Sequence, residues 1–318
     1  MSRIARYLLL FTLVSIMIAA PVAAGVVSND SVQPGVTTPA IVKISTYVVD
    51  FNRFDLLAGT VGVDFYLDMA SDTPVTIDDL ELMNGEISSI SIIKNTSHET
   101  EYRIVAILTA EPDLSRFPFD QHRIFIRLEP KYKSEQEMVL VTDPAEDILD
   151  PEADLPGWTF TSVTSSISNS SYVTDEIPFS RAVFAYGIER DITSTILKFF
   201  LPIMLIIIVS LASLLMKVSS RLGLNASMFL AAVLIHWRVA DNIPLVAYAT
   251  FLDLFMITTY ATLVMVLVSG ILILKYTEDN DTARIKQVHY WSLRLIPAIS
   301  ITMYFLLFLV FLIRPALS

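Results

Sequence analysis

The chain has 318 residues, of which 53% are hydrophobic and 17% are charged, and its formal net charge is −11. This composition is too apolar for an ordinary soluble enzyme, and the negative charge argues against nucleic acid as a partner. The absence of cysteine excludes disulfides and cysteine chemistry. The length suggests two domains.

Residues 1–24 have the pattern of a secretory signal peptide. Arg3 and Arg6 form a basic start, residues 8–18 are apolar, and residues 22–24 (VAA) offer a cleavage site of small side chains. A retained helix is the alternative. An exported chain without cysteine suits a prokaryotic envelope, so we expect a multi-pass protein of the inner membrane with its N-terminal domain outside the cytoplasm.

Residues 25–192 are predicted to form an extracytoplasmic β-sandwich. Residues 61–68 alternate apolar and polar side chains, as a half-buried strand does. Further runs of this kind, separated by turn residues, are 41–49, 87–93, 102–108, 123–128, 138–141, 159–167 and 182–188. Many short strands at this spacing are typical of an antiparallel sandwich. Residues 25–190 carry 27 acidic and 11 basic side chains, so this domain should attract cations.

An acidic stretch, residues 143–154, reads DPAEDILDPEAD. Its six carboxylates belong to Asp143, Glu146, Asp147, Asp150, Glu152 and Asp154. Calcium takes about 6–8 oxygen ligands, so one hypothesis is a modulatory calcium site. The spacing is not that of an EF-hand, and a solvated acidic loop is the alternative. We expect no cofactor to be required.

Residues 193–318 are predicted to form an all-α domain of four transmembrane helices. The apolar runs are Thr195–Met216, Leu222–Ala240, Leu245–Leu274 and Leu295–Ile313. Each is long enough to cross a bilayer, which takes roughly 20 helical residues. Basic residues gather in the two loops that this topology places in the cytoplasm, in agreement with the positive-inside rule. Pro202 lacks an amide donor and should bend or loosen the first helix.

The second apolar run is unusually polar for a helix in lipid. Steps of three and four residues place one set of side chains on a single stripe: Ser219, Gly223, Ser227, Leu230, Leu234, Trp237 or Arg238, and Asp241. A ring of such helices would form a pore with a leucine constriction that closes by dewetting. The alternative is a helix–helix contact that uses small residues for close approach.

Three stretches carry a joint pattern. Residues 110–124 read AEPDLSRFPFDQHRI, with an aromatic-Pro-aromatic-Asp core. Pro202 follows Arg190 by twelve residues, and residues 220–256 place Leu230 nine positions after a basic residue. In this order the stretches resemble the pentameric ligand-gated ion channels, that is, the Cys-loop receptors and their cysteine-free prokaryotic relatives.

The resemblance covers residues 41–313, with Ala110 and Ile124 standing where the family loop has its cysteines. It implies that the chain assembles with four identical subunits in a lipid bilayer and that the second helices line a pore for inorganic ions. It implies a gating junction formed by Asp55, Phe117, Pro118, Phe119, Asp120, Arg190 and Pro244. Within that junction, Asp55, Asp120 and Arg190 would form a charge cluster.

The resemblance leaves the agonist open, a small ligand or a proton. Around the expected ligand pocket the sequence offers four aromatic candidates: Tyr132, Tyr172, Phe179 and Phe184. Aromatic side chains at such spacings are more often part of a core than of a ligand cage. Asp241 and the acidic domain favour cations as the permeating ions, whereas Arg238 opposes them.

Two other functions compete with a channel. One is a non-channel envelope sensor with a β-sandwich binding domain, which would need a cytoplasmic output module. The other is a small transporter, which would need polar binding groups at membrane depth beyond Asp253. We do not expect an enzyme, because the sequence offers no zinc cluster, no GxSxG and no nucleophile with an orienting base.

Overall fold

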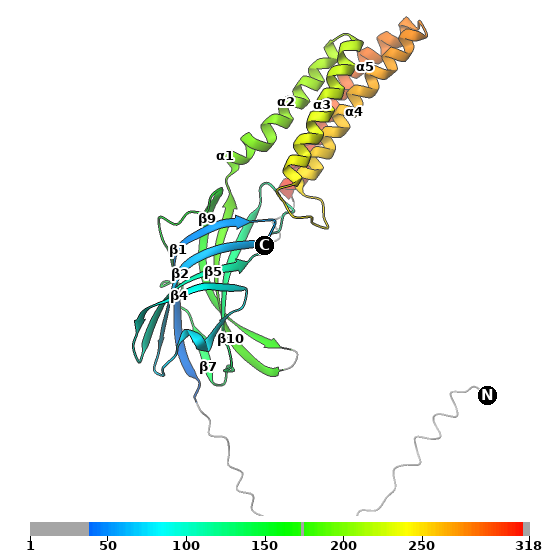
Figure 1. The fold of residues 1–318 in the computed structure, drawn as a ribbon. Helices are drawn as coiled ribbons and strands as arrows, with labels where there is room; N and C mark the ends of the chain where they lie inside the picture. Colours follow the sequence, from blue (N-terminus) through cyan, green and yellow to red (C-terminus); the bar gives the residue numbers. More distant parts are fainter. Residues whose placement is uncertain (1–37, 173–174, 314–318) are drawn as a thin grey trace, which may run out of the picture. The chain divides into compact units, whose positions relative to one another are not determined.

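Two β-sheets form the first part of the structure, a computed structural model that describes residues 38–172 and 175–313 (Figure 1). Sheet A has the strand order β4-β5-β2-β1-β7, with β8 also paired to β1, and sheet B has the order β3-β6-β10-β9. The strands are β1 (Ala40–Asp55), β2 (Thr60–Ser71), β3 (Leu80–Leu82), β4 (Gly85–Asn95), β5 (Glu99–Thr109), β6 (Gln121–Pro130), β7 (Met138–Val141), β8 (Ile148–Leu149), β9 (Trp158–Tyr172) and β10 (Asp175–Arg190). The signal peptide predicted for residues 1–24 lies outside the described residues.

Every strand expected from alternation lies within an observed strand, so the β-sandwich is confirmed. The two short strands β3 and β8 were not expected. The sandwich is not wholly antiparallel, because β7 and β8 both run parallel to β1. In β2 the apolar residues Val61, Val63, Phe65 and Leu67 are each at most 1% exposed, and they belong to the core between the sheets.

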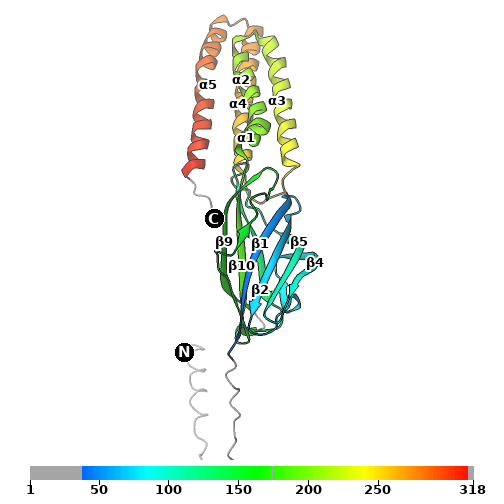
Figure 2. The same cartoon turned by 90° about the vertical axis from the view of Figure 1, so that its left-hand side faces the viewer.

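Four segments that follow the sandwich are long and apolar enough to cross a membrane: Ile196–Leu215, Val218–Ala240, Phe251–Glu278 and Thr282–Ile313. The second of these segments is the least apolar. The helical elements are α1 (Ile192–Thr195), the π-helical turn η3 (Ile196–Phe200), α2 (Leu201–Ala212), the 3₁₀ turn η4 (Ser213–Leu215), α3 (Val218–Ala240), α4 (Phe251–Glu278) and α5 (Thr282–Ile313). Helix α4 contacts α2, α3 and α5 (Figure 2).

The first spanning segment is irregular next to Pro202. The π-helical turn η3 ends two residues before this proline, and α2 has the proline within its first turn. A proline cannot donate the usual helical hydrogen bond to the fourth residue before it, and its ring crowds that carbonyl. The wider π turn is one way to accommodate this, so the expected loosening near Pro202 is confirmed.

The helix starts that differ most from the expected ones are those of α4 and α5. Helix α4 begins at Phe251 rather than Leu245, because Thr250 and Asp253 form a capping box that fixes its start. Helix α5 begins at Thr282 rather than Leu295. Its first turns are polar, so hydropathy located only the apolar part of a longer helix. The segment that joins α4 to α5 is short, residues 279–281.

Candidate functional site

The loop between β5 and β6 caps the start of α4. The first amides of a helix have no partner within the helix. The amide of Phe251 donates to the carbonyl of Ser115 at 3.0 Å, and that of Leu252 donates to the carbonyl of Phe117 at 3.1 Å. The β-rich domain is therefore joined to a spanning helix by backbone hydrogen bonds that do not depend on side-chain identity.

The segment between α3 and α4 meets the same loop through Tyr248. The Tyr248 hydroxyl accepts a hydrogen bond from the amide of Leu114 at 2.9 Å and lies 3.4 Å from Oδ1 of Asp113. Pro244, which was predicted at this junction, is half-buried in the segment. Among the described residues, the hydrogen bonds between this segment and the loop come from Tyr248 rather than Pro244.

Phe119 gathers aromatic rings from three helical segments. Its ring centroid lies 5.4 Å from that of Phe200, 5.6 Å from Phe251 and 5.5 Å from Phe311. These rings come from η3, α4 and α5. Aromatic pairs at 4.5–7 Å are worth about 0.5–1.5 kcal/mol each beyond their buried area. The aromatic positions of the FPFD core thus contact the spanning helices.

Asp120 of the same loop forms a buried ion pair with Arg190 at the end of β10. Nε of Arg190 donates to Oδ1 of Asp120 at 2.7 Å, and Nη2 donates to Oδ2 at 2.8 Å. The Asp120 side chain is fully buried. His122 supplies a further donor, with Nε2 2.6 Å from Oδ2 of Asp120. A bidentate arginine–carboxylate pair is among the strongest polar contacts in proteins.

The surroundings of this pair keep it ionised. Burial alone would raise the pKa of Asp120, but hydrogen bonds from Arg190 and His122 outweigh burial and lower the pKa to about 2. The ionised Asp120 therefore stabilises the folded state fully above the ordinary carboxyl pKa of about 4. This contribution is lost only as the pH falls through about 2. The guanidinium also lies 4.2 Å from the ring centroid of Trp158.

Asp55 does not join the pair. Its Oδ1 accepts a hydrogen bond from the amide of Ala58 at 3.1 Å within the β1–β2 turn. Aspartate readily closes a turn in this way, and that local bond determines the direction of the side chain. The expected cluster of Asp55, Asp120 and Arg190 is therefore corrected to Asp120, His122 and Arg190. The two-residue spacing of His122 from Asp120 on a strand was the available signal.

The predicted pore stripe lies on the uncovered face of α3. Ser219, Gly223, Ser227, Leu230, Leu234, Trp237 and Asp241 are all exposed in the single chain. The large apolar members stand out, since Leu230 is 60%, Leu234 56% and Trp237 65% exposed. Arg238 is exposed as well. One continuous face of α3 thus remains free of contacts with the other helices of its own chain.

The opposite face of α3 is buried and polar near its start. Asn225 accepts a hydrogen bond from the Ser210 hydroxyl at 2.5 Å and donates one to Ser213 at 2.7 Å. The Arg221 side chain is also buried, at 1% exposure. Hydrogen bonds between spanning helices hold them in one rotational setting. This network therefore fixes which face of α3 points away from α2.

A second polar contact joins α3 to α4 nearer the other end. Nδ1 of His236 lies 2.9 Å from the Tyr260 hydroxyl, and Nε2 lies 3.3 Å from Oδ1 of Asp253. His236 does not belong to the pore stripe. Its pairing with two residues of α4 supports the same rotational setting of α3 that Asn225 fixes.

The four aromatic pocket candidates do not form one wall. Tyr172 and Phe179 are in contact, with ring centroids 5.8 Å apart. Tyr132 is 82% exposed on the segment after β6. Phe184 is fully buried in the core of the sandwich, so its assignment to a pocket wall is corrected. It lies on the inward-facing side of β10, where an apolar side chain packs between the sheets.

Tyr172 is held by a buried carboxylate. Its hydroxyl donates to Oε1 of Glu129 at 2.8 Å, while Nε of Arg181 and the hydroxyl of Ser170 donate to Oε2 at 2.7 and 2.8 Å. Glu129 is only 2% exposed. The sequence analysis missed this network, because its members lie on three strands and meet only through the β6–β10–β9 pairing.

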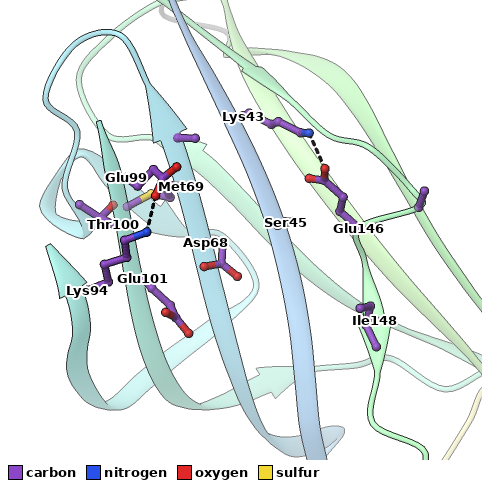
Figure 3. A pocket seen from close by; sticks show the side chains of 12 residues that line it. Lys43, Ser45, Asp68, Met69, Lys94, Glu99, Thr100, Glu101, Glu146 and Ile148 are labelled. Carbon is purple, nitrogen blue, oxygen red and sulfur yellow. Dashed lines mark hydrogen bonds and ion pairs between the residues drawn. The ribbon is translucent and has the colours of Figure 1, made fainter. Parts of the chain in front are cut away.

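A cavity of about 540 Å³ lies on the outer face of sheet A (Figure 3). Its floor comes from β1, β2 and β5, and one wall is formed by Glu146, which precedes β8, and Ile148 of β8. Ion pairs join Lys43 to Glu146 at 2.6 Å and Lys94 to Glu99. Asp68 and Glu101 also line the cavity, so four carboxylates face two ammonium groups.

Asp68 and Glu101 are direct cross-strand partners. Burial raises the pKa of Asp68, and the nearby charge of Glu101 raises it further. Like charges directly opposite each other destabilise a strand pair. The cavity therefore carries a local excess of negative charge that a cationic ligand would relieve.

We expect Asp68→Asn to raise the midpoint of thermal unfolding at neutral pH, because it removes this repulsion, which is worth about 0.2–1 kcal/mol. The gain should vanish as the pH falls through the raised pKa of Asp68, because the protonated side chain no longer carries the charge that the substitution removes. Asp64→Asn on the same strand is the control, since Asp64 faces Arg103 at 2.8 Å and its loss should lower the midpoint. A lower midpoint in both variants would contradict the repulsion.

The six carboxylates proposed for calcium do not converge. Within the described part of the chain, no three acidic or histidine side chains are grouped so that they could hold a metal ion. Asp147 is buried, Glu146 pairs with Lys43, and Asp150 accepts a hydrogen bond from Tyr47 at 2.6 Å. Calcium binding within one subunit therefore stays a prediction without a geometric basis.

Neither the models of known protein families nor the curated proteins gave a match to the chain.

Proposed function

We propose that the chain is one subunit of a homopentameric ligand-gated ion channel that passes cations. The observation that carries the proposal is the uncovered face of α3. All seven stripe residues are exposed there, although the other faces of the same helix pack against α2 and α4. Polar and small residues on a helix of membrane length are costly toward lipid, and five copies around water would relieve that cost.

In this proposal the stripe residues have different roles at successive depths of the pore. Ser219, Gly223 and Ser227 provide a polar inner end, Leu230 and Leu234 form the constriction, and Asp241 provides an outer acidic ring. Two rings of leucine side chains exclude water when the pore is narrow, so a modest widening lets ions pass. Asp241 and the acidic β-rich domain would concentrate cations, while Arg238 limits the effect.

The junction supports the coupling of an extracellular signal to this pore. The loop that holds the Asp120–Arg190 pair also caps α4 and contacts Tyr248 in the segment that leads from α3. A shift of this loop therefore acts on the start of α4 and on the segment that leads to it from α3. The signal itself is a small ligand, a proton or a divalent cation, and the acid-lined cavity on sheet A favours a positively charged one.

A non-channel sensor or a small transporter is the competing proposal. The three residues between α4 and α5 leave no room for an output module at that connection. Polar groups at membrane depth, such as His236 and Asn225, are engaged in hydrogen bonds between helical segments of the same chain. Both observations favour the channel.

Leu230→Ser should open the purified protein, reconstituted in liposomes, at rest. The substitution removes the apolar contact of the constriction, which is worth about 1.5–3 kcal/mol per leucine, so resting cation flux should rise at least about tenfold. Ile301→Ser on α5, where the parent side chain is 67% exposed, is the matched control and should leave flux unchanged. Equal flux in Leu230→Ser and the parent protein would argue against the channel.

A further inference from the structure

Asp147 lies between the two sheets although it belongs to an acidic surface segment. Its side chain is buried, at 8% exposure. The amide of Thr46 on β1 donates to its Oδ1 at 3.0 Å. Its two neighbours point outward, because Glu146 pairs with Lys43 and Ile148 lines the cavity of sheet A. The segment therefore inserts one carboxyl into the core and keeps the rest at the surface.

The cluster around this carboxyl contains no cation. From β9, the hydroxyl of Ser165 is buried beside it, and neither Ser165 Oγ nor Asp147 Oδ2 has a hydrogen-bond partner in the described chain. From β10, Tyr186 contributes a hydroxyl that shares a 2.9 Å hydrogen bond with Thr46 of β1. The charged group of the segment itself that acts on Asp147 is Asp143, another carboxylate.

The two protonation states of Asp147 fit this cluster unequally. As a carboxylate it is a buried anion that holds one amide donor and faces neutral or negative groups, an arrangement that is costly without a cation. As a carboxylic acid it carries no charge, and its O–H can donate to Ser165, so a hydrogen bond between them does not require a buried anion. Burial accordingly raises the pKa of Asp147, although Ser165 and Thr46 stabilise the charged form.

We propose that residues 143–149 act as a proton-operated clasp, which docks between the sheets when Asp147 is protonated and is released when Asp147 ionises. The sign follows from the raised pKa of the docked carboxyl. Docking is fully favoured below the ordinary carboxyl pKa of about 4, and this preference is lost as the pH rises through the docked value. The clasp is thus closed in acid and loosened toward neutrality.

Release of the clasp changes the cavity of sheet A. Ala145, Glu146 and Ile148 line one side of that cavity, and β8 pairs with Tyr47 and Val48 of β1. When the segment undocks, this wall of the cavity and the parallel pairing of β8 with β1 are both lost. If the chain is the channel proposed above, acid would therefore close this wall and alkali would open it. The clasp itself does not depend on that function.

The test is hydrogen–deuterium exchange of the full-length protein in detergent, followed in peptides that cover residues 143–150 and corrected for the intrinsic pH dependence of exchange. The protection of these amides should fall at least about tenfold between pH 4 and pH 7. Asp147→Asn resembles the protonated acid and should remain protected at both pH values. Glu152→Gln, at an exposed acid that follows the clasp, should titrate as the parent protein does.

Equal protection at pH 4 and pH 7 in the parent protein would overturn the clasp, and so would an unchanged titration in Asp147→Asn. If Asp147→Asn does not fold, Ser165→Ala gives an independent answer. It removes a hydroxyl that stabilises the carboxylate, so protection should persist to higher pH than in the parent protein, and an unchanged titration would contradict the proposal. Exchange requires no ion flux, so a failure of the channel proposal is seen separately.

Discussion

Arg190→Ala is expected to abolish ion flux and to lower the free energy of unfolding of the β-rich domain by about 3–5 kcal/mol. The reason is the stranded charge that remains. Asp120 is fully buried and loses a bidentate partner whose two hydrogen bonds measure 2.7 and 2.8 Å, leaving only His122 to stabilise its carboxylate. Thermal unfolding of the detergent-purified protein and flux in liposomes measure the two effects.

The chain offers a matched control for this loss. Arg103 forms a bidentate pair with Asp64 on sheet A, but there the arginine side chain is 44% exposed. Water replaces an exposed partner, so Arg103→Ala should cost less than about 1 kcal/mol and leave flux intact. Similar losses in Arg190→Ala and Arg103→Ala would show that burial of the Asp120 pair is unimportant.

A pair of substitutions that removes both charges tests whether the Asp120–Arg190 ion pair takes part in gating or is only a fixed structural contact. Asp120→Asn combined with Arg190→Gln removes the stranded charge and retains amides that can bond to each other. If stability returns while flux stays absent, the ion pair itself operates the junction. If both return, the pair serves only to hold the loop against β10.

The strands were predictable because their pattern is local. Alternation along residues 61–68 depends only on which face of β2 meets the core, and that face is the same wherever the strand pairs. The ends of the helices were less predictable. Thr250 and Asp253 start α4 through a capping box that hydropathy does not register, and the polar first turns of α5 lie outside any apolar window.

The candidate site also contains features that the sequence could predict and features that it could not. The α3 stripe was predictable from a single helix, since period and polarity decide it. The loop carbonyls of Ser115 and Phe117 that cap α4 leave no trace in the sequence, because any residue supplies a carbonyl. Asp55 was misplaced because its local bond to Ala58 competes with the distant arginine, and only the folded backbone shows which contact forms.

Charged thiol reagents should label Ser227→Cys rapidly from water in the assembled protein, because this residue lies on the uncovered face of α3 and the proposal places that face in the pore. The chain has no native cysteine, so each single variant reports on one position. A lipid-facing thiol reacts slowly with such reagents, since thiolate formation and the reagent both require water. We expect a rate difference of at least about a hundredfold, the equivalent of about 3 kcal/mol in access to water.

Two further cysteine variants serve as controls for the labelling of Ser227→Cys. Ala232→Cys lies on the buried side of α3 and should react slowly because α3 packs against other helices there. Ile301→Cys is exposed on α5 and should also react slowly, because the proposal places it in lipid. Exposure in the single chain is common to Ser227 and Ile301, so only the solvent that covers each face distinguishes them. If both react at the slow rate, α3 faces lipid and the chain forms no central pore.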